Sequence, residues 1–235
     1  VTQLTSGPHT NDHPRWSPDG ATIAFISNRT GLHQIWLMNA DGTNQRQLTH
    51  DNVHHAYPVW HPDGKSLICC ANYSDKEEIN IWQIGLDGGA PLRALVEKCG
   101  VESEPTVSPD GAKLVFAASY AGNYDLWELP LAGGDKRQIT SHPARDYAPS
   151  YSPGGKFIAF ISTPEMTADM KRPSTNSDVW LISTEKGSAP MKLTTNRGAD
   201  MHVSWSPDGQ HLVYCAGEGS PGSGRLALID LERGK

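Results

Sequence analysis

Histidines and carboxylates recur at two fixed distances before a short motif that the chain repeats, first seen as Trp16-Ser17-Pro18-Asp19-Gly20. The residues five positions before each copy of the motif are Asn11, His55, Glu102, Asp146 and Asp200. The residues three positions before each copy are His13, Tyr57, Glu104, Ala148 and His202. Imidazole and carboxylate groups bind polar ligands or divalent cations when a fold brings them together.

Two kinds of chemistry are open to this set. One is a metal site, with His13, His55 and His202 as nitrogen ligands and Glu102 or Glu104 as oxygen ligands. The other is a hydrated polar rim that binds no metal. Because no local spacing enforces a metal site, we expect no cofactor and keep a divalent metal as the alternative.

A second candidate surface is the long insertion at residues 163–177. It carries two apolar and two basic side chains that suit contact with a protein surface: Met166, Met170, Lys171 and Arg172. The other interpretation is a surface loop without a partner. A Gly/Ser-rich stretch at residues 217–224 looks like a simple flexible connection.

The elements that must position these residues follow from the repeat itself. The motif begins at Trp16, Trp60, Val107, Tyr151 and Trp205. Its Pro, Asp and Gly suit a tight turn, because Pro fixes φ and Gly accepts a positive φ. Each turn leads into a β-branched or aromatic segment such as residues 22–27, then a third segment ending near a Trp, then a Gln-Leu-Thr-like fourth. Four short strands per unit describe a propeller blade.

The order of these segments resembles the TolB-like (PD40) repeat across nearly the whole chain. The Gly-His and Trp-Asp pairs of WD40 blades and the double glycine of kelch blades do not recur in register. We therefore expect an all-β fold, a five-bladed β-propeller of four-stranded antiparallel blades forming one domain over residues 1–235. The seven tryptophans occupy fixed blade positions, which favours packing between blades over sugar stacking.

The phase of the repeat predicts how the ring closes. The chain opens on a fourth-strand segment, Gln3-Leu4-Thr5, and ends just after a third-strand segment, Leu226 to Asp230. We expect the opening residues to complete the last blade, since closure removes exposed sheet edges. A fragment of a larger ring, or of a longer enzyme, is the alternative. The constant spacing of 12 residues from the first residue of each Leu-Thr-like pair to the next motif predicts a rim of fixed geometry at the channel mouth.

Composition excludes two classes of partner. A net charge of −6 and a pI near 5.9, without a basic stripe, argue against nucleic acid. The apolar runs are strand-sized, so we expect no membrane insertion. The four cysteines lack metal-ligand spacing, and we expect free thiols. The resemblance implies a periplasmic or other extracytoplasmic location, with a cytoplasmic one as the alternative, and we favour a monomer.

Three functions fit these observations. We favour a non-catalytic binding module that docks a protein or peptide on its loop-bearing face, as the resemblance to TolB implies. GxSxG, HExxH and Gly-rich phosphate loops are all missing from the sequence. The first alternative is a metal-dependent lyase of the oligogalacturonate type, in which Arg145 or Arg197 meets a uronate carboxylate. The second is the propeller of a prolyl-oligopeptidase-like peptidase.

Overall fold

The computed structural model describes residues 1–71, 79–87, 91–96, 104–163, 176–195, 198–217 and 224–232. Nineteen β-strands account for its regular structure, and these residues contain no helix. Consequently no described helix could cross a lipid bilayer. The chain divides into two compact units, residues 1–107 and 108–235, and each is treated by itself below.

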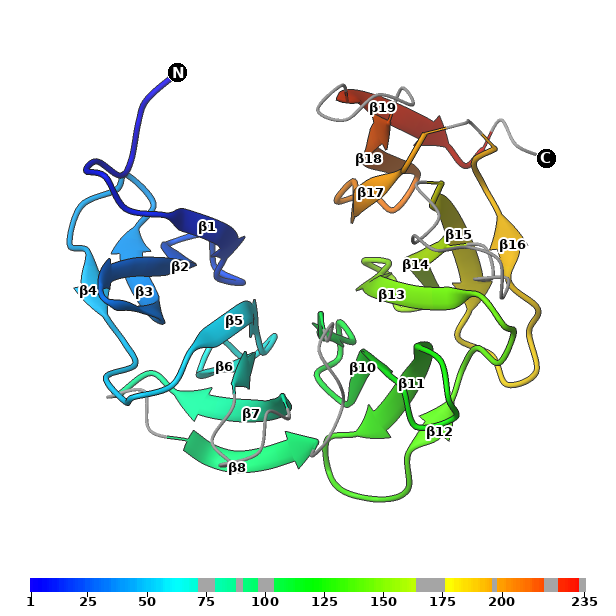
Figure 1. The fold of residues 1–235 in the computed structure, drawn as a ribbon, viewed down its shortest axis with the longest axis horizontal. Coiled ribbons are helices and arrows are strands. Elements are labelled where there is room, and N and C mark those ends of the chain that lie inside the picture. The colour runs from blue at the N-terminus through cyan, green and yellow to red at the C-terminus, as the bar shows by residue number, and fades with distance from the viewer. Residues whose placement is uncertain are drawn as a thin grey trace. The chain divides into compact units, whose positions relative to one another are not determined.

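The first unit contains two antiparallel sheets (Figure 1). The first sheet has the strand order β1 (Asn11–Trp16), β2 (Thr22–Thr30), β3 (Leu32–Asn39) and β4 (Arg46–Gln47). The second sheet has the order β5 (His55–Trp60), β6 (Ser66–Ala71), β7 (Asn80–Gly85) and β8 (Pro91–Val96). Each strand therefore pairs with its neighbour in sequence, as in a propeller blade.

Three further antiparallel sheets follow, the third beginning at the border of the second unit. The third sheet has β9 (Thr106–Val107), β10 (Lys113–Ala118), β11 (Asp125–Pro130) and β12 (Arg137–Gln138). The fourth has β13 (Arg145–Tyr151), β14 (Phe157–Thr163), β15 (Asp178–Ser183) and β16 (Met191–Lys192). The fifth has β17 (Met201–Trp205), β18 (His211–Gly217) and β19 (Gly224–Asp230).

Five consecutive antiparallel blades confirm the all-β, five-bladed propeller class predicted from the repeat. One detail of the prediction was wrong. The described fifth sheet has three strands, and residues 1–6 form no strand. Leu4 instead accepts a hydrogen bond from Gln45 Nε2 at 2.8 Å and packs over Gly42, on the cluster of Ile23, Phe25 and Met38. Burial of that one leucine fixes the segment without any strand pairing.

The repeated motif closes the turn between the first two strands as its residue types predict. In the first sheet the Ser17 hydroxyl donates to Asp19 at 2.5 Å, and the same carboxylate accepts from the Ala21 amide at 3.0 Å. Gly20 supplies the positive φ of 70° that ends the turn. The hydrogen bonds from Ser17 and Ala21 lower the pKa of Asp19, so the turn carboxylate is charged at neutral pH.

Neighbouring sheets within each unit pack face to face through apolar side chains. In the first unit, Ile35 and Leu37 lie in one cluster with Trp60, Leu67 and Ile84 of the next sheet. Other clusters join the third sheet to the fourth and the fourth to the fifth. Trp60 agrees with the packing interpretation of the tryptophans, because it lies in the interface and is 8% exposed, whereas Trp16 is 58% exposed and does not.

Candidate functional site

A bulge interrupts the first strand of four sheets at the same repeat position. Pairing shifts register between Asp12 and Arg15 in β1, and at the equivalent places in β5, β13 and β17. Each bulge holds a non-glycine residue in the left-handed region, namely His13 (φ 49°), Tyr57 (φ 53°), Ala148 (φ 51°) and His202 (φ 56°). Bulges redirect side chains, and strained conformations of this kind cluster at functional sites.

These bulge residues are the set predicted three positions before the motif. In the first unit two of them meet. The rings of His13 and Tyr57 pack edge to face with centroids 4.7 Å apart. Asp12 Oδ1 lies 3.0 Å from His13 Nδ1, which orients the imidazole. The His13 side chain keeps 33% of its surface exposed, so it remains accessible to a ligand.

Two residues of opposite charge in the same unit, Arg15 and Glu104, influence each other electrostatically. Arg15 is exposed as a whole, but desolvation of its guanidinium group lowers its pKa. The negative charge of Glu104 partly opposes this shift by raising the pKa of Arg15. Glu104 is the third predicted residue of the set that lies in the first unit. His13, Tyr57, Arg15 and Glu104 are called the rim cluster below. Its groups can donate, accept and stack, but they form no nucleophile–base pair.

The residues five positions before the motif have a different environment. His55 is 1% exposed, and Asp146 and Asp200 are both 0% exposed. Asn11 is half-buried and accepts from Arg29 Nη2 at 2.8 Å. The side chains of His55, Asp146 and Asp200 are therefore enclosed by protein, in contrast to the partly exposed bulge residues.

His55 belongs to a buried line of polar groups. Its Nε2 lies 2.9 Å from Asp51 Oδ1, and its Nδ1 lies 3.7 Å from Cys69 Sγ. A thiol, an imidazole and a carboxylate in this order have the composition of a nucleophilic triad. However, Cys69 is fully buried, and burial raises the pKa of its thiol, so the reactive thiolate is suppressed. Burial also lowers the pKa of His55, partly opposed by Asp51. These contacts connect Asp51, in the segment before β5, with β5 and with Cys69 of β6.

The fourth sheet has the same pair of residue types four positions apart, but with the histidine and the aspartate exchanged. Here His142 Nε2 lies 3.3 Å from Asp146 Oδ2. Burial raises the pKa of Asp146 to about 6, while hydrogen bonds from Ser162 and Thr140 and the nearby His142 oppose the shift. Burial likewise raises the pKa of Asp125, a second carboxylate in this cluster. The exchanged histidine and aspartate show that these two positions serve packing in both sheets.

The predicted metal ligands do not form a metal site within the described residues. No group of three or more His, Cys, Asp or Glu side chains there has suitable geometry. His55 is paired with Asp51, whereas His13 and His202 belong to different units. The metal hypothesis therefore stays a prediction. Several other predicted residues lie outside the described chain: Glu102, Met166, Met170, Lys171, Arg172 and Arg197.

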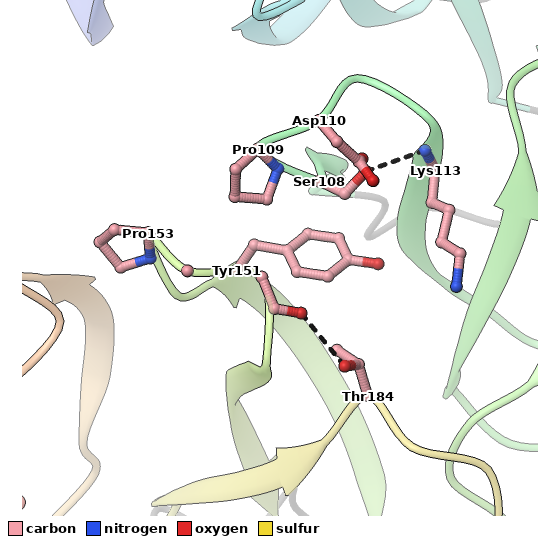
Figure 2. Close-up of a pocket in the computed structure, with 9 residues that line it drawn as sticks. Ser108, Pro109, Asp110, Lys113, Tyr151, Pro153 and Thr184 are labelled. Atoms are coloured by element: carbon pink, nitrogen blue, oxygen red, sulfur yellow. Dashed lines mark hydrogen bonds between the residues drawn. The ribbon is translucent and has the colours of Figure 1, made fainter.

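Each unit also has a hollow beside its motif turns. In the second unit the pocket encloses about 230 Å³ and is lined by Asp110, Lys113, Tyr151 and Thr184 among others. Figure 2 shows the Tyr151 ring lying between the turn that carries Asp110 and the side chain of Thr184. A pocket of about 450 Å³ in the first unit has Trp60 in the corresponding place. The sequence did not predict either pocket, although the motif residues that line both pockets are the clearest repeat in the chain.

Two residues that line the pocket of the second unit, Lys113 and Tyr151, also belong to a charge cluster centred on Glu128. Glu128 is 5% exposed and contacts Lys113 Nζ at 3.4 Å and Arg137 Nη2 at 3.1 Å. The Tyr151 hydroxyl lies 3.5 Å from the same carboxylate, and burial together with the charge of Glu128 raises the pKa of Tyr151. The charges of Glu128, Lys113 and Arg137 are therefore paired with one another, whereas within the described residues Asp110 at the pocket wall accepts hydrogen bonds only from the Ser108 hydroxyl and the Ala112 amide.

Comparisons with known proteins agree with the repeat. The TolB beta propeller domain family matches residues 1–91. An uncharacterized protein of Agrobacterium fabrum, Atu1656, is 30% identical over 208 residues, which cover 87% of this chain and 69% of that protein. An uncharacterized peptidase of Bacillus subtilis, YuxL, is 32% identical over 179 residues, 76% of this chain but 25% of the peptidase.

A solved structure gives the same result for the fold. TolB from Acinetobacter baumannii superposes with a TM-score of 0.78 at 24% identity, covering 97% of this chain and 54% of that protein. The chain thus spans between 25% and 69% of the length of these relatives. The chain belongs to the TolB-like β-propeller family.

Proposed function

We propose that the chain is a non-catalytic binding module that docks a protein or peptide through the rim cluster. The observation that carries this proposal is the contact between His13 and Tyr57, two residues from neighbouring sheets held in left-handed bulges. Maintaining strained backbone at each position costs on the order of 1–3 kcal/mol. Such a cost is expected where side chains must be presented in a particular direction.

The chemistry of the rim cluster supports recognition of a peptide. Tyr57 offers a large ring with few rotatable bonds, as at many interface hot spots. Arg15 and Glu104 supply opposite charges that can pair with peptide backbone or side-chain groups. Cys69, a nucleophile candidate among the described residues, is buried and burial raises the pKa of its thiol, which favours binding over covalent catalysis.

The test is a peptide-display selection on the folded chain, followed by affinity measurements on the selected peptides. Tyr57→Ala should weaken binding by at least about tenfold, because an anchoring aromatic is lost. Tyr57→Phe is the matched variant that keeps the ring, and Lys156→Ala alters an exposed residue on a motif turn. Selected peptides that bind Tyr57→Ala and His13→Ala as tightly as wild type would remove the rim cluster from the proposal.

The insertion at residues 163–177 remains a second proposed contact for the same partner. Replacing Met166 and Met170 with serine should reduce capture of a selected peptide if the loop takes part. Unchanged affinity in this variant, together with loss in Tyr57→Ala, would confine docking to the rim cluster. Similarity to TolB also leads us to propose an extracytoplasmic location, which fractionation of cells producing the native protein would check.

The propeller of a peptidase is a second candidate function. The similarity to peptidase YuxL favours it, since that relationship covers 76% of this chain. In this case the rim cluster would contact a peptide substrate while other residues carry out hydrolysis. Hydrolysis of dipeptidyl substrates by a longer native protein that contains this propeller, but not by the purified chain alone, would support this candidate.

One contact supports the alternative that the chain is a metal-dependent lyase. A carboxylate that holds one nitrogen of a histidine leaves the other nitrogen free to ligate a cation, and Asp12 holds His13 in this way. Elemental analysis after incubation with Mn²⁺, compared between wild type and His13→Gln, would test for that ligand. Equal metal content in the two proteins, or none, would count against it.

A further inference from the structure

The pockets of the two units are lined by the same nine positions of the repeat, and each pocket lies between the motif turns of two consecutive sheets. Five of these positions carry the same residue type in both pockets, namely one serine, two prolines, one aspartate and one glycine. The other four positions differ. Because each pocket lies within one unit, these four differences show what is particular to the pocket of the first unit.

Two of the differences change the charge of the pocket. Thr22 of the first unit stands where the second unit has Lys113. Asp63 stands where the second unit has Gly154. The described lining of the first-unit pocket therefore has two carboxylates, those of Asp19 and Asp63, and contains no lysine or arginine. The second-unit pocket instead has one carboxylate and one ammonium group.

The other two differences change the walls of the pocket. Trp60 stands where the second unit has Tyr151, and the half-buried Leu86 stands where it has a threonine. The first-unit pocket is also larger, at about 450 Å³ against about 230 Å³. Trp60 donates its indole N–H to the Arg15 carbonyl at 3.0 Å, which fixes the ring in place. The first-unit pocket thus combines a negative charge with an apolar, aromatic wall.

Both aspartates keep one oxygen atom for a ligand. The turn hydrogen bonds of Asp19 reach its Oδ1. Asp63 Oδ1 accepts from the Lys65 amide at 2.8 Å and lies 2.9 Å from His61 Nδ1. Within the described residues these contacts all reach Oδ1, so Oδ2 of each aspartate is available. Hydrogen bonds lower the pKa of both carboxylates, which are therefore charged at neutral pH.

The nearby cations of the first unit stand outside the lining of this pocket. The charge of Lys65 contributes to the lowered pKa of Asp63, but Lys65 does not line the pocket. Arg46, at the position that Arg137 has in the third sheet, is exposed and does not line it either. A ligand would therefore supply the positive charge that the lining lacks. The net charge of −6 on the chain favours the approach of such a ligand.

We propose that the first-unit pocket binds an arginine side chain of a partner peptide. The guanidinium group donates to Oδ2 of Asp19 and of Asp63, and its plane packs against Trp60. A guanidinium group is favoured over an ammonium group because its planar set of N–H donors reaches two carboxylates at once and stacks on an aromatic ring. The prolines and Leu86 contact the methylene groups of the arginine.

This site is separate from the rim cluster. In β1 and β5 the bulge residues His13 and Tyr57 lie near the start of the strand, whereas the motif turns follow the end of the strand. The arginine site uses the turns and contains no bulge residue. The two proposals can therefore fail separately.

The test is a titration of the full chain with the peptide acetyl-Gly-Arg-Gly-amide. The readout is the indole N–H signal of Trp60 in nitrogen–proton NMR correlation spectra, assigned with the variant Trp60→Phe. We expect the peptide to shift this signal with a dissociation constant on the order of 1 mM, as suits a few partly exposed ionic contacts. The same peptide with citrulline in place of arginine keeps the shape but not the charge, and it should leave the signal unchanged.

Three variants test the role of the charges. Asp63→Gly gives the pocket the glycine of the second unit and should weaken binding by about three- to tenfold. Asp208→Gly is the matched control, because it removes the aspartate at the same motif position of the fifth sheet, which does not line this pocket. Thr22→Lys introduces the ammonium group of the second unit and should also weaken binding, so the test does not depend on the folding of one variant.

Three results would overturn the proposal. The first is an arginine peptide that leaves the Trp60 signal unchanged, or a citrulline peptide that shifts it equally. The second is equal affinity of Asp63→Gly and Asp208→Gly for the arginine peptide. The third is a shift of the signal by calcium chloride but not by the arginine peptide, which would assign the two carboxylates to a metal ion.

Discussion

Replacing Ala148 with glycine tests whether the bulge residues are held in a strained conformation. Ala148 has a φ of 51°, and an L-residue in this region costs roughly 1–2 kcal/mol relative to its ordinary conformations. Glycine removes that cost. It also increases the entropy of the unfolded chain, by about 0.4–1 kcal/mol, and deletes a half-buried methyl worth about 0.4 kcal/mol. We expect Ala148→Gly to leave stability unchanged or to raise it by up to about 1 kcal/mol.

Ala56→Gly is the matched control. Ala56 is also half-buried and lies in a first strand, directly before the bulge residue Tyr57, but its φ is not positive. Glycine there brings only the two unfavourable terms, a loss of about 1 kcal/mol. The difference between the two variants isolates the strain, about 1–2 kcal/mol, and urea titration followed by tryptophan fluorescence measures it. Equal losses of stability in the two variants would refute strained bulges and weaken the argument for presented side chains.

Three further predictions concern the buried polar groups. His55→Ala should destabilise the chain by about 2–4 kcal/mol, because Asp51 loses its buried partner and a cavity forms, and a loss below 1 kcal/mol in urea titration would contradict this. Asp146 has its pKa raised to about 6, so the folded state holds its proton more tightly. Stability should therefore fall as pH rises from about 4 to about 6, by no more than about 3 kcal/mol, and Asp146→Asn should flatten this slope. Cys69 and Cys70 should react with a thiol reagent only after denaturation, because both are buried; rapid labelling of the native chain would contradict their burial.

The blades were predictable because their signals are local. The turn residues of each motif fix a hairpin through contacts within five positions, as the bonds among Ser17, Asp19 and Ala21 show. Strand pairing then follows the order of the sequence. That residues 1–6 form no strand, and that the described part of the fifth sheet has three strands, was not predictable in this way. It depends on whether Leu4 gains more from burial on the first sheet or from pairing with a distant strand, and no local pattern reports that balance.

The positions of the candidate site residues within the repeat were predictable, but the directions of their side chains were not. The constant spacing before each motif identified His13 and Tyr57 as equivalent positions, and their rings do meet. Nothing in the spacing indicated that His55 would be enclosed. The turn-side pockets were missed for a related reason, since residues such as Asp110 were assigned to turn formation and not considered as the lining of a hollow.

Alternation along a strand explains why the two sets of predicted site residues differ. Residues three and five positions before the motif are two apart, so in a regular strand they would face the same side. The left-handed residue in each bulge breaks that alternation. His55 therefore turns inward to Asp51 while Tyr57 stays partly exposed beside His13. The histidine and its aspartate partner are exchanged in the fourth sheet, where the inner position is again fully buried and its partner is again 30% exposed. The proposed recognition surface therefore depends on the bulge positions, where histidine, tyrosine and alanine occur in different sheets and the side chains are at least partly exposed.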